Sequence, residues 1–151
     1  MPEQSDQSVL ELSFRIAASP ERVFAAIAEP EQFAHWFGTS AVEVPLDQLV
    51  WHPEEGGNWR AMMVLPDGAC IHWHGTFMEV DPPRRLVITM DDDPLMDSTD
   101  PTSFTLIPDG DGTIVQVQQF TPGFSAEEQE ATRAGYQAFL TDMAALIAAD
   151  A

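Results

Sequence analysis

The sequence predicts an α+β fold in which helices cover one antiparallel sheet. Apolar and polar residues alternate over several consecutive segments between residues 42 and 120, which is typical of half-buried strands. Turns rich in Gly, Pro and Asp join these segments, which favours hairpins over parallel units joined by helices. Between residue 126 and about residue 149, apolar residues recur three and four positions apart, which predicts one long C-terminal helix.

The N-terminal third predicts one strand and two short helices. Residues 9–17 form the strand, with an apolar face made by Leu10, Leu12, Phe14 and Ile16. A helix begins after Ser19, because serine caps a helix and Pro20 suits its first position. Pro30 ends this helix and begins a second one that runs to Gly38.

The middle of the chain predicts a meander of strands. Two short candidates lie within residues 42–51, and residues 59–65 and 71–77 form a hairpin about Pro66-Asp67-Gly68. Further strands follow at residues 86–90, around Phe104 and Leu106, and around Val115 and Val117, with residues 91–100 as an acidic loop. The sheet is therefore expected to have about six or seven strands.

The long C-terminal helix has a clear start. Ser125 and Glu128 form a capping box, in which each side chain accepts a hydrogen bond from the main chain of the other residue. An antiparallel sheet with one apolar face needs a cover, and this helix is the expected cover.

The charge of the chain is strongly negative. Among its 151 residues are 25 Asp and Glu, against 6 basic residues that are all arginine, so the formal net charge is −19. Nucleic acid and membrane surfaces are excluded as expected partners, because both bind basic surfaces. The N-terminus lacks the basic and apolar regions of a signal peptide, and Cys70 is the single cysteine, so we expect a cytoplasmic protein.

Several short segments, in a fixed order, resemble the START/Bet v 1-like (SRPBCC) superfamily. The closest similarity is to its activator of Hsp90 ATPase homologue branch, the Aha1 C-terminal domain type. The matching segments include residues 16–24, Trp36-Phe37-Gly38, Gly56-Gly57, residues 79–86 and Gly135-Tyr136. The resemblance implies a helix-grip fold, with a curved sheet wrapped around the C-terminal helix. It also implies a single domain over residues 9–150, after a flexible tail of residues 1–8.

The resemblance further implies a cavity between sheet and helix, and alternation assigns its lining. The inward positions on the strands and on the helix are Trp59, Met63, Trp73, Phe77, Gln119, Tyr136, Phe139 and Met143. Gln119 shares the face of two valines and needs a hydrogen-bond partner, which a ligand could supply. The alternative is that these residues fill a closed core, which is the usual role of such apolar stripes.

Three functions remain open at this stage. The leading hypothesis is binding, without turnover, of a small hydrophobic or aromatic molecule in the cavity. The alternatives are a co-chaperone or protein-interaction module of the Hsp90-activator type, and a cyclase or dehydratase-like enzyme. No catalytic residue is assigned, because neither Gln119 nor Tyr136 is a good base at neutral pH. The sequence allows a monomer or a homodimer.

Neither a metal nor a cofactor is expected. His72 and His74 lie on the same face of one strand and Trp73 takes the inward face, so both histidines should point to solvent. A zinc site would need a third ligand from a neighbouring strand. The sequence also lacks the glycine-rich motifs that bind nucleotide phosphates.

The charge balance gives the first testable prediction. Unpaired carboxylates repel one another more strongly in the compact fold than in the unfolded chain. Salt shortens the Debye length from ~30 Å at ~0.01 M to ~8 Å at physiological strength. We therefore expect the melting temperature to rise between low salt and several hundred millimolar sodium chloride. A melting curve that does not move with salt would contradict this.

Overall fold

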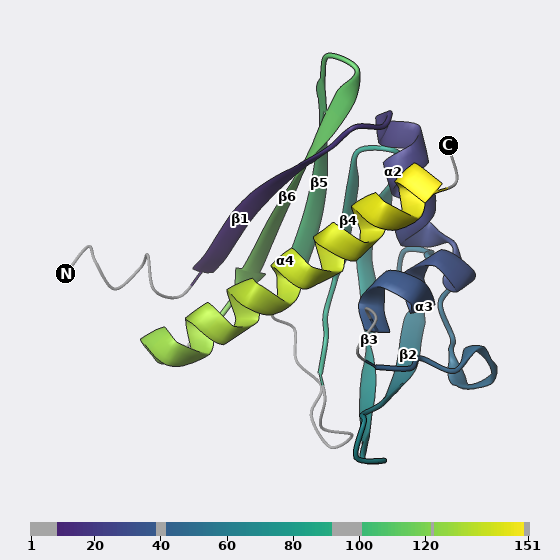
Figure 1. Ribbon diagram of the computed structural model, residues 1–151, viewed down its shortest axis with the longest axis vertical. Helices are drawn as coiled ribbons and strands as arrows, with labels where there is room; N and C mark the ends of the chain where they lie inside the picture. The colour runs from purple at the N-terminus through teal and green to yellow at the C-terminus, as the bar shows by residue number, and fades with distance from the viewer. Residues whose placement is uncertain (1–8, 39–41, 92–100, 122, 150–151) are drawn as a thin grey trace.

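The computed structural model of the chain describes residues 9–38, 42–91, 101–121 and 123–149 (Figure 1). The expected tail at residues 1–8 and most of the expected acidic loop at residues 91–100 lie outside these ranges. The elements, in chain order, are β1 Val9–Ile16, α2 Pro20–Ala28, α3 Pro30–Gly38, the 3₁₀ turn η1 Leu46–Gln48, β2 Asn58–Val64, β3 Cys70–Asp81, β4 Arg85–Ile88, β5 Thr102–Asp109, β6 Gly112–Phe120 and α4 Ala126–Ala149.

The six strands form one sheet in the order β1-β6-β5-β4-β3-β2, and every neighbouring pair is antiparallel. The predicted α+β class and the helix-grip arrangement are confirmed. The two short strands predicted within residues 42–51 are not formed. That segment only makes isolated bridges from Glu43 to Val64 and from Val50 to Arg60, with η1 between them. Pro45 precedes η1 and has no N–H for a ladder, which explains the interruption.

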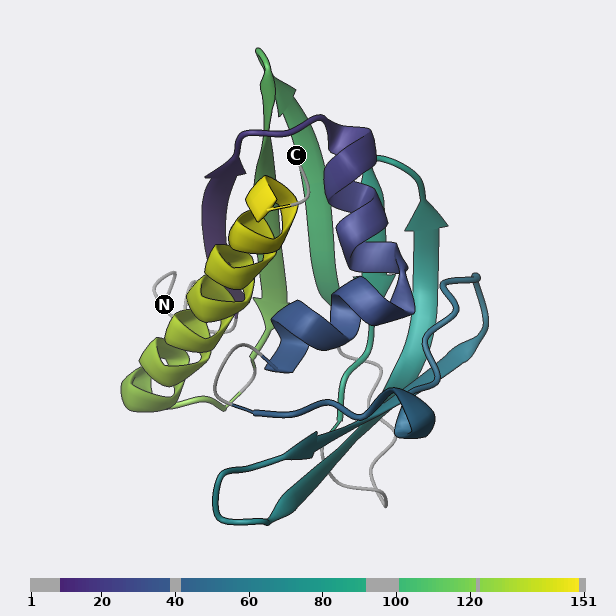
Figure 2. The same cartoon turned by 45° about the vertical axis from the view of Figure 1, so that its right-hand side comes forward.

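The sheet curves because β3 is long and changes partners along its length. Its first half pairs with β2 and its second half with β4, and a bulge lies between Phe77 and Glu79. A bulge bends its strand and increases the local twist. Figure 2 shows the consequence, since the β2–β3 hairpin swings away from the other four strands.

The helices lie together on one face of the sheet. In Figure 1, α4 crosses that face diagonally, with α2 and α3 beside it. α2 packs on β5 and β6, whereas α4 packs on β1 and α3. The Arg133 side chain of α4 also donates a 2.8 Å hydrogen bond to the main-chain oxygen of Glu11 in β1. None of the described helices is both long and apolar enough to span a bilayer.

The predicted helix starts are confirmed at atomic detail. The Ser19 hydroxyl accepts a 3.2 Å hydrogen bond from the Arg22 main-chain N–H at the start of α2. At α4, the Ser125 N–H donates to the Glu128 carboxylate at 2.8 Å, and the Glu128 N–H donates to the Ser125 hydroxyl at 3.1 Å. These bonds satisfy main-chain donors that have no partner within the helix.

The end of α2 is held by two tryptophans. The indole N–H of Trp36 donates to the main-chain oxygen of Ala26 at 2.8 Å, and that of Trp51 donates to the oxygen of Ile27 at 2.9 Å. The usual donor to the Ala26 oxygen would be the N–H of residue 30, which is a proline and has none. The two indoles therefore satisfy carbonyls at the α2–α3 junction.

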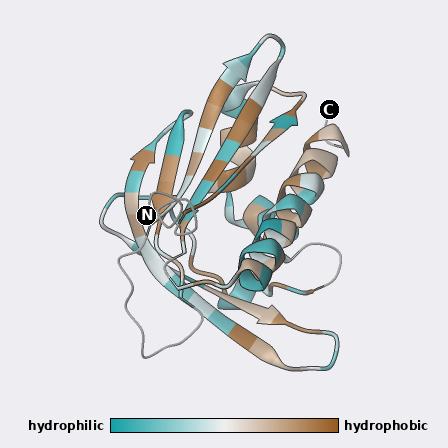
Figure 3. Ribbon diagram, turned by 90° about the vertical axis from the view of Figure 1, so that its left-hand side faces the viewer, coloured by the Kyte–Doolittle hydropathy of each residue, from teal (hydrophilic) through white to brown (hydrophobic). Residues whose placement is uncertain are grey.

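Residue alternation separates the two faces of the sheet. Figure 3 shows apolar and polar residues alternating along the strands. Val115 and Val117 in β6 are fully buried, whereas the neighbouring Gln116 and Gln118 are only half-buried. The core therefore lies between the sheet and the three helices.

One close approach in the sheet gives the second testable prediction. A Cβ atom on Gly75 would lie 1.9 Å from the main-chain oxygen of Thr89 and 2.6 Å from the indole nitrogen of Trp59. These two atoms are themselves hydrogen-bonded at 2.9 Å. We expect Gly75→Ala to lower the free energy of unfolding by about 2 to 4 kcal/mol through overpacking, measured by urea denaturation.

Gly135→Ala is the matched control for this substitution. Gly135 lies inside α4, and an added Cβ would meet no atom within 4 Å. Alanine is the better helix former, so this variant should gain up to about 1 kcal/mol. Equal effects of the two substitutions would contradict the close contact at Gly75.

Candidate functional site

The residues predicted to line a cavity lie on the predicted faces. Trp59, Phe77 and Met143 are fully buried, and Tyr136 and Met63 are nearly so. Three members are half-buried, namely Trp73, Gln119 and Phe139. The alternation along β2 and β3 therefore predicted side-chain direction correctly. Whether these residues contact a ligand stays a prediction.

Two of the half-buried residues have partners within the protein. The Trp73 indole N–H donates to the sulfur of Met63 at 3.2 Å, across the β2–β3 pair. Its ring also lies edge-on to Phe37 in α3, with 6.1 Å between ring centroids. Phe139 packs against the same α3 ring at 5.3 Å. α3 thus bridges β3 and α4.

The inward glutamine is satisfied by the protein itself. The Tyr136 hydroxyl donates a short hydrogen bond to the side-chain oxygen of Gln119. Thr102, which lies opposite Gln119 in the β5–β6 pair, also hydrogen-bonds the Tyr136 side chain. Among the described residues, every fully buried side-chain nitrogen or oxygen has a hydrogen-bond partner. The ligand that the sequence suggested as a partner for Gln119 is therefore not required.

Burial controls the ionisation of this cluster. It raises the pKa of the Tyr136 hydroxyl above its ordinary value of 10.0, and the hydrogen bond with Thr102 offsets part of that rise. Tyr136 therefore stays protonated at neutral pH and acts as a hydrogen-bond donor. It is not available as a base.

The space beside Tyr136, between sheet and helices, is closely packed among the described residues. In the described part of the chain, the gap beside Tyr136 has a volume of about 10 Å³. A gap of this size holds one water molecule at most, whereas ligand pockets measure about 300 Å³ or more. Its walls are Ile27, Phe33, Trp36, Phe37, Trp51, Trp59, Leu86, Ile88, Met90, Phe104, Tyr136 and Phe139. Only three of the eight predicted lining residues are among them.

The aromatic residues of α3 explain the filling. Phe33, Trp36 and Phe37 enter the space that the sequence analysis left for a cavity, and Phe33 stacks on Trp51 with 3.8 Å between centroids. Their i, i+3, i+4 spacing was a usable signal, because it places all three rings on one side of a short helix. The rings of α3 therefore fill the space beside Tyr136, and an open cavity elsewhere between sheet and helices stays a prediction.

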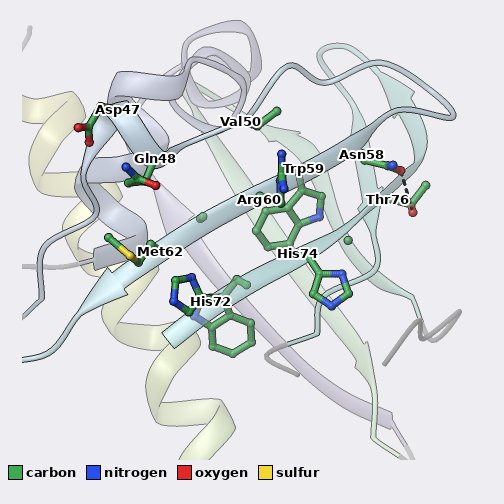
Figure 4. A pocket seen from close by; sticks show the side chains of 13 residues that line it. Asp47, Gln48, Val50, Asn58, Trp59, Arg60, Met62, His72, His74 and Thr76 are labelled. Atoms are coloured by element: carbon green, nitrogen blue, oxygen red, sulfur yellow. Dashed lines mark hydrogen bonds between the residues drawn. The ribbon is translucent and has the colours of Figure 1, made fainter. Parts of the chain in front are cut away.

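A larger hollow lies on the outer face of the β2–β3 hairpin. This outer groove has a volume of about 900 Å³. One of its walls is formed by Asp47 and Gln48 of η1 and by Val50 just after it, which together are called the η1 segment. The strands contribute outward-facing side chains to it, which are Asn58, Arg60, Met62, His72, His74 and Thr76. Figure 4 shows these side chains on adjacent strands beside the η1 segment. Both histidines lie on the outward face as predicted, whereas the groove itself was not predicted.

Arg60 has a distinctive position in the outer groove. It lies directly opposite His74 in the β2–β3 register, and the next outward pair is Met62 and His72. Its side chain forms no ion pair or hydrogen bond with any residue that the structure describes. Within the described ranges, no three histidine, cysteine or acidic side chains lie close enough to hold a metal ion.

The six-stranded antiparallel sheet and the helices on one of its faces define a helix-grip α+β protein. Residues 17–148 match the family described as activator of Hsp90 ATPase homolog 1-like protein, and the chain belongs to that family. No curated protein matches the chain significantly. The resemblance found in the sequence is thereby confirmed.

Solved structures from bacteria share the fold over nearly the whole chain. An AHSA1 protein from Silicibacter pomeroyi is 25% identical, with a TM-score of 0.82 over 95% of this chain and 99% of that one. A protein from Mycobacterium smegmatis is 20% identical, with a TM-score of 0.80 over 97% and 94%. A protein from Chromobacterium violaceum is 23% identical, with a TM-score of 0.79 over 93% and 97%.

The buried phenol gives the third testable prediction. Tyr136 is the only tyrosine, so the near-ultraviolet absorbance of phenolate reports on it alone. In the folded protein we expect no phenolate signal at pH 10.0, the ordinary midpoint. Because the folded-state pKa is raised, Tyr136 stabilises the fold below pH 10.0 and this contribution is lost as the pH rises further.

The urea-unfolded protein is the control for this titration, and it should titrate near pH 10.0. Tyr136→Phe should abolish the signal in both states. A folded-state midpoint at or below the unfolded one would show that the hydroxyl is open to water.

Proposed function

We propose that this protein is a non-catalytic protein-interaction module of the Hsp90-activator type. The observation that carries the proposal is the close packing beside Tyr136, where the gap among the described residues measures only about 10 Å³. A helix-grip protein that stores or converts a small molecule needs a chamber of roughly 300 Å³ or more between sheet and helix. A module that acts through its outer surface needs no such chamber.

The outer surface supports the same function. Val50 lines the outer groove and is 38% exposed. Leu46, which precedes the lining residue Asp47 in the chain, is 52% exposed. Exposed apolar residues that border a hollow are typical of interaction surfaces. By contrast, the buried Tyr136 offers neither an ionised group nor room for a substrate, which weighs against the cyclase-like alternative.

Family membership suggests the kind of partner. The family is described by the activation of the Hsp90 ATPase, and its match covers residues 17–148. We therefore propose an Hsp90-type chaperone as the partner, bound transiently and without turnover of any small molecule by this chain.

The fourth prediction tests this proposal with a purified Hsp90-type chaperone from the same organism. Calorimetric titration should give a dissociation constant of about micromolar order, which is the weak end of the range for protein complexes and suits transient binding. The chaperone's ATPase rate should change on addition of this protein. Absence of both binding and a rate change would contradict the proposal.

The ligand-binding alternative is tested in parallel with Nile red, a neutral apolar dye. If the protein acts through its outer surface, the wild type should give no saturable fluorescence increase, because the dye needs a chamber of roughly 300 Å³ or more. Leu140→Ala is the matched negative control, because Leu140 is 1% exposed and the void left by its truncation is too small for the dye, so this variant should not bind Nile red either. Saturable one-to-one binding of Nile red by the wild type would favour an interior ligand site instead.

A further inference from the structure

The cationic side chains of this acidic protein are distributed unevenly. Four arginines form ion pairs with carboxylates, with nitrogen–oxygen distances from 2.8 to 3.8 Å, namely Arg15, Arg84, Arg85 and Arg133. Arg60 forms none with the described residues, although the chain has 25 acidic residues. Its guanidinium therefore keeps five N–H donors for a group from outside the chain.

Polar side chains lie around Arg60 in the outer groove. His74 lies directly opposite, His72 lies on the same face of β3, and Asn58 is the preceding outward residue of β2. The Asn58 side-chain oxygen accepts a hydrogen bond from the Thr76 hydroxyl at 3.4 Å. Asp47 is the one carboxylate in the lining of the outer groove, and it forms no ion pair with Arg60. Arg60 is therefore a cationic group that this lining does not neutralise by direct contact.

Apolar surface lies within the same groove. Val50 and Met62 line it beside the polar groups, and Val50 is 38% exposed. Asn58, Arg60 and Met62 are alternate residues of one strand, so they repeat about every 6.5–7 Å along the groove. An extended peptide repeats its side chains at the same interval, so one side chain can meet Arg60 while the next meets Met62.

We propose that the outer groove binds an acidic, extended segment of a protein partner. A carboxylate of that segment pairs with the Arg60 guanidinium, and an adjacent aliphatic side chain packs against Val50 and Met62. This inference rests on the proposed function, since it names the docking surface and the chemistry of the partner. Guanidinium–carboxylate pairs can be bidentate, which fixes position as well as charge.

The net charge of −19 does not prevent this binding. At physiological ionic strength the Debye length is about 8 Å, so charges on remote parts of the surface are screened. Contacts within the groove are shorter than that distance and keep most of their strength. Higher salt screens both the repulsion by remote carboxylates and the attraction to Arg60. Within the groove, the attraction to Arg60 is the larger of the two.

The fifth prediction uses a fluorescein-labelled Glu-Leu-Glu-Leu-Glu-Leu peptide and anisotropy at physiological salt. The peptide should bind the wild type, and Arg60→Gln should weaken binding about tenfold or more, as loss of a charge-assisted hydrogen bond does. Arg84→Gln is the matched control, because Arg84 is exposed and pairs only with Asp81 among described acidic residues. It should bind as the wild type does, and a Lys-Leu peptide should not bind.

Three outcomes would overturn the groove assignment. They are equal binding by Arg60→Gln and wild type, equal binding of the lysine peptide, and full displacement by free glutamate or inorganic phosphate at the same anion concentration. The last would indicate a site for a free small anion rather than for a peptide. Because the Arg60 side chain is exposed, we expect Arg60→Gln to keep the melting temperature of the wild type. A difference in peptide binding between the two proteins then reflects the groove.

The chaperone titration separates the two proposals. If Arg60→Gln binds the Hsp90-type chaperone as well as the wild type does, the groove is the wrong surface and the proposed function stands. If the chaperone binds neither protein while the peptide still depends on Arg60, the groove assignment stands and the proposed partner is wrong.

Discussion

The rest of the structure depends on how the main-chain oxygens at the α2–α3 junction obtain hydrogen-bond donors. Pro30 allows two helices to follow one another at a sharp angle, but it removes the N–H that the Ala26 carbonyl would otherwise accept. Trp36 supplies that donor at 2.8 Å, and Trp51 supplies one to Ile27 at 2.9 Å. Unmade hydrogen bonds of buried carbonyls are costly, so the two indoles fix both the helix angle and the path of the following segment.

This constraint determines what fills the interior. With Trp36 held against α2, α3 directs its aromatic face towards the sheet, and Phe33 stacks on Trp51 at 3.8 Å. Trp59 completes the cluster and donates to Thr89 at 2.9 Å. Rings therefore occupy the volume beside Tyr136. A groove of about 900 Å³ lies outside, where the chain around η1 passes over the curved β2–β3 hairpin.

Local patterns predicted the fold well, because strand alternation and helix capping depend on residues close in sequence. Ser125 caps α4, and Trp59 and Phe77 face inward as the period-two pattern requires. The close packing beside Tyr136 was not predictable in this way. It depends on the contact between Phe33 and Trp51, which come from separate elements and meet only in the folded chain. The outer groove escaped prediction for the same reason, since alternation gives the direction of Arg60 but not the position of its opposite wall.

The proposed function at the outer surface requires an interior without a ligand chamber between sheet and helices. The volume change of unfolding under hydrostatic pressure tests it most directly, because that change scales with the internal void volume lost on unfolding. The account predicts a small change, within the usual range of about −20 to −100 mL/mol. A change several times larger would reveal a hollow interior and contradict the account.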